Sequence, residues 1–117
     1  FDFLAEVPSE TLVRELNPNF ALIERATSRG VIVTAKSRSA DYDFVSRFFS
    51  PQSGVAEDPV TGSAHCCLGP YWGPRIGKNE LVGHQASSRG GIVRVKLLDD
   101  RVILGGQAVT VFRGEVP

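Results

Sequence analysis

The chain of 117 residues is 42% hydrophobic and 22% charged, which is the composition of one ordinary globular domain. Its 13 basic and 13 acidic side chains give a net charge of zero, so we expect neither nucleic acid nor an anionic membrane surface as a partner. No apolar run is long enough to span a membrane, and adjacent Cys66 and Cys67 offer no disulfide framework, so we expect a cytoplasmic protein.

The first half of the chain is predicted to contain three strands and two short helices. Ser9 and Asn17 each precede a helical pattern with an apolar stripe and are expected to cap it. The third strand carries apolar side chains on both faces, with Arg47 as the exception, so we expect both faces to be covered. In chain order these elements are a strand over 1–7, a helix over 10–16, a helix between Pro18 and Arg29, and strands over 31–35 and 42–49.

The second half is predicted to contain a central helix followed by strands, after a loop that ends in an acidic segment. Small and apolar residues from Gly62 to Ile76 predict a helix that is apolar all round, with a kink or restart at Pro70. The pair Gly105-Gly106 predicts a bulge or a close backbone approach. The predicted strands cover 81–86, 91–97, 101–104 and 108–112.

The order of these elements predicts an α+β fold, in which an antiparallel or mixed, barrel-like sheet wraps around one central helix. Strands and helices do not alternate regularly, which argues against a doubly wound parallel sheet. The chain begins at Phe1 and contains no Met. We therefore expect residues 1–117 to be a single domain of a longer protein, with which an active site can be shared.

Acidic residues directly precede the predicted central helix, in the segment Glu57–Cys67. The first backbone N–H groups of a helix have no partner within it, and the helix dipole adds positive charge there. Gly62 allows a ligand close to the backbone and Ser63 adds a hydroxyl, so a carboxylate or phosphate is the expected occupant. Asp58 either caps the helix or faces the bound anion. No glycine-rich nucleotide-binding motif accompanies the segment.

The histidines and cysteines nearby favour structural roles. His65 lies inside the apolar helix, which is typical of a hydrogen-bonded core histidine. Cys66 and Cys67 are interpreted as small hydrophobic side chains, since no base is paired with either. Together with His84 these residues lack the spacing of a tetrahedral zinc site, so we expect no metal and no cofactor.

The run Glu57-Asp58-Pro59-Val60-Thr61-Gly62-Ser63-Ala64-His65, with Ser46-Arg47-Phe48-Phe49 before it, resembles the phenazine-biosynthesis PhzF-like family. Gln85-Ala86-Ser87, Arg89-Gly90-Gly91 and Leu104-Gly105-Gly106-Gln107-Ala108 extend the resemblance over most of the chain. The resemblance is to the C-terminal half of that family. It implies the diaminopimelate-epimerase fold, in which two similar domains, each a barrel-like sheet around a helix, enclose the active site between them.

The resemblance implies a cofactor-independent isomerase or epimerase that transfers a proton on a small carboxylate-bearing substrate. Its main base would be a glutamate of the N-terminal half, which has no counterpart in this chain. The resemblance assigns Asp58 and Ser63 as assisting catalytic residues and Thr61, Gly62 and Ser63 as substrate-binding residues. The expected partners are the substrate and the N-terminal half of the same protein.

Two other hypotheses come from different classes of protein. One is a non-catalytic binding or partner module that keeps the fold. The other is a homodimer, in which two copies of Asp58 would lie across a pseudo-cleft, since the two halves of this architecture are alike.

Overall fold

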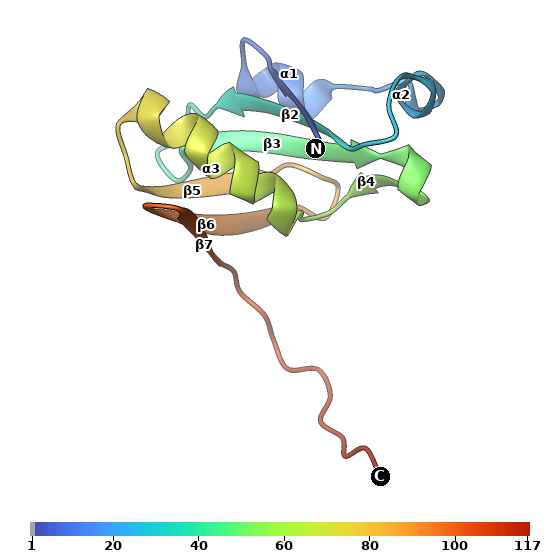
Figure 1. Ribbon diagram of the computed structural model, residues 1–117, viewed down its shortest axis with the longest axis vertical. Helices are drawn as coiled ribbons and strands as arrows, with labels where there is room; N and C mark the ends of the chain where they lie inside the picture. The colour runs from blue at the N-terminus through green and yellow to red at the C-terminus, as the bar shows by residue number, and fades with distance from the viewer. Residues whose placement is uncertain (1) are drawn as a thin grey trace.

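A computed structural model describes residues 2–117 and shows a curved, mixed β-sheet with helices on both faces (Figure 1). In the described residues the sheet has seven strands, in the order β1-β2-β3-β5-β6-β7, with β4 paired to β3. The strands are β1 (Phe3–Glu6), β2 (Val31–Lys36), β3 (Phe44–Ser50), β4 (Val55–Asp58), β5 (Glu80–Gln85), β6 (Gly91–Leu98) and β7 (Arg101–Gly105). The helices are α1 (Glu10–Glu15), α2 (Phe20–Ala26), the short 3-10 helix η1 (Pro51–Ser53) and α3 (Gly62–Ile76).

The sheet combines two pairing directions and remains open. β1 runs parallel to β2 and β3 runs parallel to β5, whereas the other paired strands are antiparallel. β1 and β7 end the strand order and do not pair with each other, so the sheet curves around α3 without closing into a barrel. The predicted α+β fold, a mixed sheet around a central helix, is confirmed. No helix in residues 2–117 is long and apolar enough to cross a membrane.

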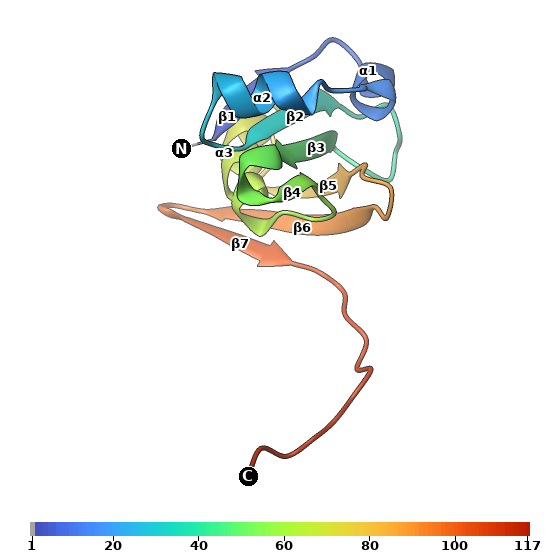
Figure 2. The same cartoon turned by 90° about the vertical axis from the view of Figure 1, so that its right-hand side faces the viewer.

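Two hydrophobic cores lie on opposite faces of the sheet, with α1 and α2 on the face away from α3 (Figure 2). β3 supplies both cores because successive side chains of a strand point to opposite faces. Phe44 and Phe48 belong to the core under α3, and Val45 and Phe49 belong to the core under α1. The prediction that this strand is covered on both sides is confirmed.

α3 has the predicted bounds but not the predicted uniform environment. Thr61 is its N-cap, Gly77 ends it in the left-handed conformation with φ 76°, and it runs without a restart through Pro70, which is exposed. Cys66 and Cys67 are also exposed, so the interpretation of both as buried hydrophobic side chains is wrong. One face of the helix is buried against the sheet, namely Ala64, His65, Leu68, Gly69, Trp72 and Gly73.

Two local predictions need correction. α2 is capped by Asn19 rather than Asn17, because the Asn19 Oδ1 accepts the amide of Leu22 at 3.1 Å. Residues 55–58 were expected to be loop but form β4, which pairs with β3 in an antiparallel hairpin across the short connection 51–54. Ser9, by contrast, caps α1 as predicted and accepts the amide of Leu12 at 3.2 Å.

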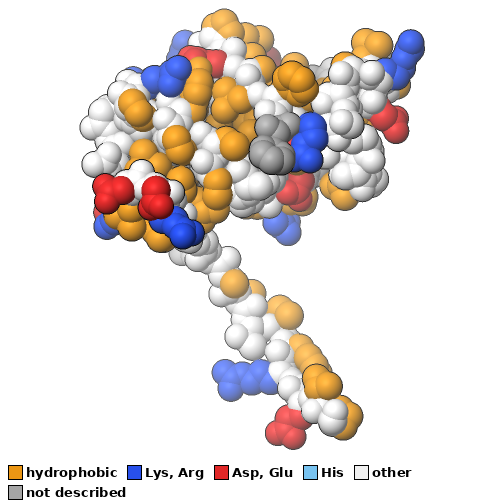
Figure 3. Space-filling view, viewed as in Figure 1, with side chains coloured by type: hydrophobic (Ala, Val, Ile, Leu, Met, Phe, Trp, Pro, Cys, Tyr) orange, Lys and Arg blue, Asp and Glu red, His pale blue; other side chains and the backbone are white. Residues whose placement is uncertain are grey.

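The predicted strand over 108–112 is wrong. After Gly105 the chain has no regular secondary structure and extends away from the domain (Figure 1). Apolar side chains such as Val111 and Phe112 are 90% and 83% exposed, and Figure 3 shows hydrophobic groups along this tail. An apolar, β-branched segment becomes a strand only beside another strand, and none of the described strands pairs with it.

Arg47, the exception in the apolar pattern of β3, links three elements. Its Nε and Nη2 donate to the two carboxylate oxygens of Glu57 on β4 at 2.7 and 2.8 Å. Its Nη1 donates at 2.6 Å to the carbonyl of Leu16, which follows α1. This bidentate contact and the bond to Leu16 satisfy the hydrogen-bonding groups of the guanidinium inside the domain, and they hold α1 against β3 and β4.

We therefore expect Arg47→Met to destabilise the domain. The substitution leaves the partly buried carboxylate of Glu57 without its cation, and removing one partner from a buried pair costs about 3–5 kcal/mol. Urea denaturation followed by circular dichroism measures the loss. Lys96→Met is the control, because the Lys96–Glu80 pair is exposed, and its unfolding midpoint should match that of the unsubstituted protein. Equal midpoints for both variants would contradict the linking role of Arg47.

Candidate functional site

The acidic segment forms a corner between β4 and α3. β4 ends at Asp58, which pairs with Phe48 on β3, and α3 begins only four residues later at Gly62. The turn through Pro59 and Val60 reverses the chain between them. The corner is therefore fixed at one end by the sheet and at the other by the buried face of the helix.

The Asp58 carboxylate points to a side chain rather than to the helix backbone. The Thr61 hydroxyl donates to its Oδ2 at 2.5 Å. Among residues 2–117 no backbone amide donates to the Asp58 carboxylate, and its Oδ1 accepts no hydrogen bond. Asp58 is thus not a helix cap, and one of its carboxylate oxygens is free to meet a ligand.

Thr61 is held from several directions. It is only 7% exposed, and its amide donates to the Oε1 of Gln85 at 2.8 Å. The Nε2 of Gln85 donates at 3.0 Å to the Thr61 hydroxyl and at 2.7 Å to the carbonyl of Asp58. The polar groups of Thr61 are therefore engaged within the protein, which suits a positioning role better than the direct substrate contact predicted from the resemblance.

Gln85 is the polar residue of the corner that sequence analysis did not assign. It ends β5 and is fully buried in a strand whose buried positions are otherwise apolar or glycine. The sequence signal that could have identified Gln85 is a polar amide at a core-facing position of a strand, because such a group needs hydrogen-bond partners inside the protein. Its partners lie 24 to 27 residues away in the chain, so their identity could not be read locally.

The first residues of α3 present the groups expected of an anion site. Gly62 and Ser63 are exposed, and within residues 2–117 their amides and the Ser63 hydroxyl have no hydrogen-bond partner. A Cβ built on Gly62 would meet only Leu104, at 3.7 Å, so the space in front of this backbone is open. Unpaired amides at a helix start, with its positive dipole end, can bind a carboxylate.

His65 is a core histidine, as its position in the sequence suggested. It is fully buried, and its Nδ1 donates at 2.8 Å to the carbonyl of Thr61. Its Nε2 is buried with no partner among the described residues. Burial lowers the pKa of His65, while the bond to Thr61 opposes the shift, so the ring stays neutral near pH 7.

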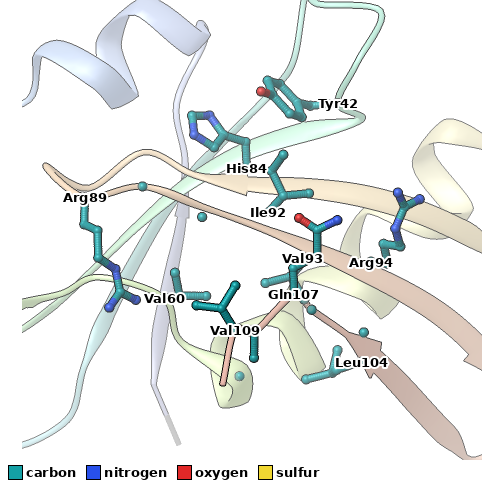
Figure 4. A pocket seen from close by; sticks show the side chains of 16 residues that line it. Tyr42, Val60, His84, Arg89, Ile92, Val93, Arg94, Leu104, Gln107 and Val109 are labelled. Atoms are coloured by element: carbon teal, nitrogen blue, oxygen red, sulfur yellow. The ribbon is translucent and has the colours of Figure 1, made fainter. Parts of the chain in front are cut away.

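A cavity of about 900 Å³ opens beside the start of α3 (Figure 4). Figure 4 shows Arg89 and Arg94 at opposite ends of it, with Tyr42 and His84 along one side. Of the four residues predicted for the site, only Gly62 lines it. The cavity is therefore adjacent to the corner rather than centred on the Asp58 carboxylate. No cluster of three or more metal-binding side chains occurs in the described part of the chain.

The loop between β5 and β6 supports the corner from outside. The Ser87 hydroxyl donates to the carbonyl of Pro59 at 2.8 Å and accepts the amide of Gly90 at 3.0 Å. Val60 packs directly on Gly91, where a Cβ would lie 2.2 Å from the Val60 Cγ2. The glycine thus allows the turn of the corner to approach β6.

Known proteins resemble the chain over nearly its whole length. A family model described as phenazine biosynthesis-like protein matches residues 2–114. An uncharacterized isomerase of Halalkalibacterium halodurans is 60% identical, over 99% of this chain and 44% of that protein. An uncharacterized isomerase of Pseudomonas aeruginosa is 50% identical, over 97% of this chain and 42% of that protein.

Solved structures share the fold. The crystal structure of a phenazine biosynthesis PhzC/PhzF-type protein from Clostridium difficile has a TM-score of 0.86 at 40% identity. The match covers 99% of this chain and 44% of that one. A PhzF-family protein from Enterococcus faecalis has a TM-score of 0.83 at 41% identity, over 88% of this chain and 39% of that one. The chain spans less than half the length of these relatives.

The contact between Val60 and Gly91 gives a prediction for the corner. Gly91→Ala forces Val60 to move, because the added methyl would overlap it, and overpacking of this kind costs about 1–3 kcal/mol. Gly106→Ala is the matched control, since a Cβ there meets nothing within 4 Å. Amide chemical shifts around Val60 and thermal unfolding should change in the first variant only. Unchanged shifts at the corner in Gly91→Ala would contradict the tight contact.

A second prediction follows from the lowered pKa of His65. Below its ordinary value of 6.5 the unfolded chain takes up a proton that the folded chain excludes, so stability falls as the pH decreases from about 7.5 to 5.5. One such group contributes up to about 1.4 kcal/mol per pH unit. His84, whose pKa is lowered by burial and by Arg14, adds a weaker effect of the same sign because it is more exposed to solvent.

Urea denaturation at several pH values tests this assignment. His65→Asn should flatten the pH dependence more than His84→Asn does, even though it lowers stability at pH 7.5. An unchanged slope in His65→Asn would show that the ring is not held neutral.

Proposed function

Because the chain belongs to the PhzC-PhzF family of phenazine biosynthesis-like proteins, we propose that it supplies one wall of the active site of a cofactor-independent isomerase or epimerase. The names of its relatives support isomerase chemistry at the level of the family. In this proposal residues 1–117 form a single domain equivalent to the C-terminal half of a two-domain protein. The N-terminal half supplies the opposite wall and the main general base, a glutamate.

The substrate in this proposal is a small molecule that bears a carboxylate. The amides of Gly62 and Ser63 and the Ser63 hydroxyl bind its anionic group, since they are exposed donors at the positive end of α3. The same donors stabilise negative charge that develops when a proton leaves the neighbouring carbon. Ser63 thereby has both a binding and an assisting catalytic role.

Asp58 assists the proton transfer. The observation that supports this role most directly is its geometry: one oxygen is held by Thr61 and the other is free. A carboxylate that caps nothing and keeps a free oxygen is suited to accept or position a proton. Thr61 contributes by orienting Asp58. The proposed location is the cytoplasm, and no membrane or nucleic-acid partner is part of the proposal.

Solvent hydrogen exchange tests the proposal in the complete protein that carries this domain. A panel of small chiral and unsaturated carboxylic acids is incubated with the enzyme in D₂O, and incorporation of deuterium is followed by NMR. Asp58→Asn should slow exchange of the active compound by about 10²–10⁴-fold, the usual contribution of a positioned acid or base. Ser63→Ala should raise KM and also lower kcat, because it removes a donor both to the bound carboxylate and to the negative charge that develops during proton transfer.

Asp99→Asn serves as the control, since Asp99 lies in the exposed turn between β6 and β7. If Asp58→Asn exchanges deuterium as fast as Asp99→Asn, the catalytic role of Asp58 is lost. If the unsubstituted complete protein exchanges none of the compounds, the alternative is favoured, namely a binding module that keeps the fold without the chemistry.

A further inference from the structure

Gln85 makes an unusually complete set of hydrogen bonds for a buried side chain. It is 0% exposed, and both ends of its amide are used. The Oε1 accepts from the backbone of Thr61, and the Nε2 donates to the carbonyl of Asp58 and to the hydroxyl of Thr61. A buried amide with all these bonds satisfied is rigid, because losing any of them leaves a polar group without a partner.

The orientation of the amide follows from its neighbours. The backbone amide of Thr61 is only a donor, so it must face the oxygen of Gln85. The carbonyl of Asp58 is only an acceptor, so it must face the nitrogen. The two backbone groups thus fix which end of the Gln85 amide is which, without reference to any ligand.

This orientation determines where the hydroxyl proton of Thr61 goes. The hydroxyl accepts an N–H from Gln85 at 3.0 Å, so its own proton cannot point back along that line. The Oδ2 of Asp58, 2.5 Å away, is the acceptor that remains. Gln85 therefore aims the Thr61 hydroxyl at one specified oxygen of the Asp58 carboxylate.

We propose that Gln85 is a positioning residue that acts through Thr61 to fix the Asp58 carboxylate and leave its Oδ1 free for the substrate. The inference rests on the proposed function, because it assigns a reason for the geometry of Asp58 in proton transfer. Gln85 itself touches no reacting atom in this scheme. Gln85 keeps the Oδ2 of Asp58 bonded to Thr61 and thereby fixes the direction of the Oδ1. Proton transfer requires this kind of preorganisation.

Thr61→Val separates this role from simple support of the turn. Valine removes the hydroxyl but keeps the backbone amide and leaves the bond from Gln85 to the carbonyl of Asp58 in place. In the complete protein we expect Thr61→Val to lower kcat for the deuterium exchange by about 10- to 100-fold, with KM changed less than about threefold. Thr61→Ser restores the hydroxyl and should recover kcat to within about threefold.

Gln85→Leu should lower kcat to a similar extent, and the double variant should be little slower than either single one, because both act on the same carboxylate. Thr11→Val, an exposed position on α1, is the matched control and should match the unsubstituted enzyme. A normal kcat in folded Thr61→Val, together with inactive Asp58→Asn, would overturn the positioning role and leave the proposed function standing. A fully active Asp58→Asn would instead overturn the proposed function.

NMR of the unsubstituted protein tests the hydrogen bonds without any variant. The side-chain amide protons of Gln85 and the hydroxyl proton of Thr61 should exchange slowly with water, since their partners are inside the protein. Rapid exchange of either set would show that Gln85 does not hold Thr61, whatever the activity measurements give. This measurement remains decisive if Gln85→Leu fails to fold.

Discussion

The close packing of α3 against β6 sets the position of everything at the corner. Gly69 and Gly73 lie on the buried face of the helix, and a Cβ on either would come within 2.6 Å of a side chain of β6. The absence of those two side chains lets the helix rest on the sheet with Trp72 and Leu68 filling the core beside it. Because a helix is stiff, this contact in its middle also determines where its first residues lie.

At that first turn two buried polar side chains hold the peptide groups of Thr61. The ring of His65, one turn into the helix, donates to the carbonyl of Thr61. The side-chain oxygen of Gln85, on β5, accepts the N–H of Thr61. One contact comes from within the helix and the other from the sheet, so the turn cannot rotate relative to either. The amide of Gln85 and the Nδ1 of His65 are paired in this arrangement, and an alternative arrangement would leave them without partners.

Most of the correct predictions depend on residues that lie close together in the chain. The bounds of α3, the cap at Ser9 and the two-sided burial of β3 all follow from patterns a few residues long. Two of the errors concern strand pairing, which the pattern of a single segment does not specify. β4 exists because β3 lies beside it, and the segment after Gly105 is not a strand because it has no such neighbour.

The site could also be predicted only in part from the sequence. The acidic corner was located from its sequence, but Gln85 needed the fold, since its contacts with Thr61 and Asp58 span 24 and 27 residues. Local pattern also left two roles open for Asp58. Only the bond to the Thr61 hydroxyl shows that the carboxylate does not cap the helix.

The start of α3 has no side-chain cap among the described residues. A side chain at the N-cap position that accepts one of the first amides stabilises a helix by about 0.5–2 kcal/mol. Here Asp58 turns to Thr61 instead, and the amides of Gly62 and Ser63 stay exposed. The first turn of α3 therefore lacks this stabilising contact, because the hydroxyl of its N-cap residue Thr61 is engaged with Asp58. Departures of this kind from local stability are expected where a site must stay open for a ligand.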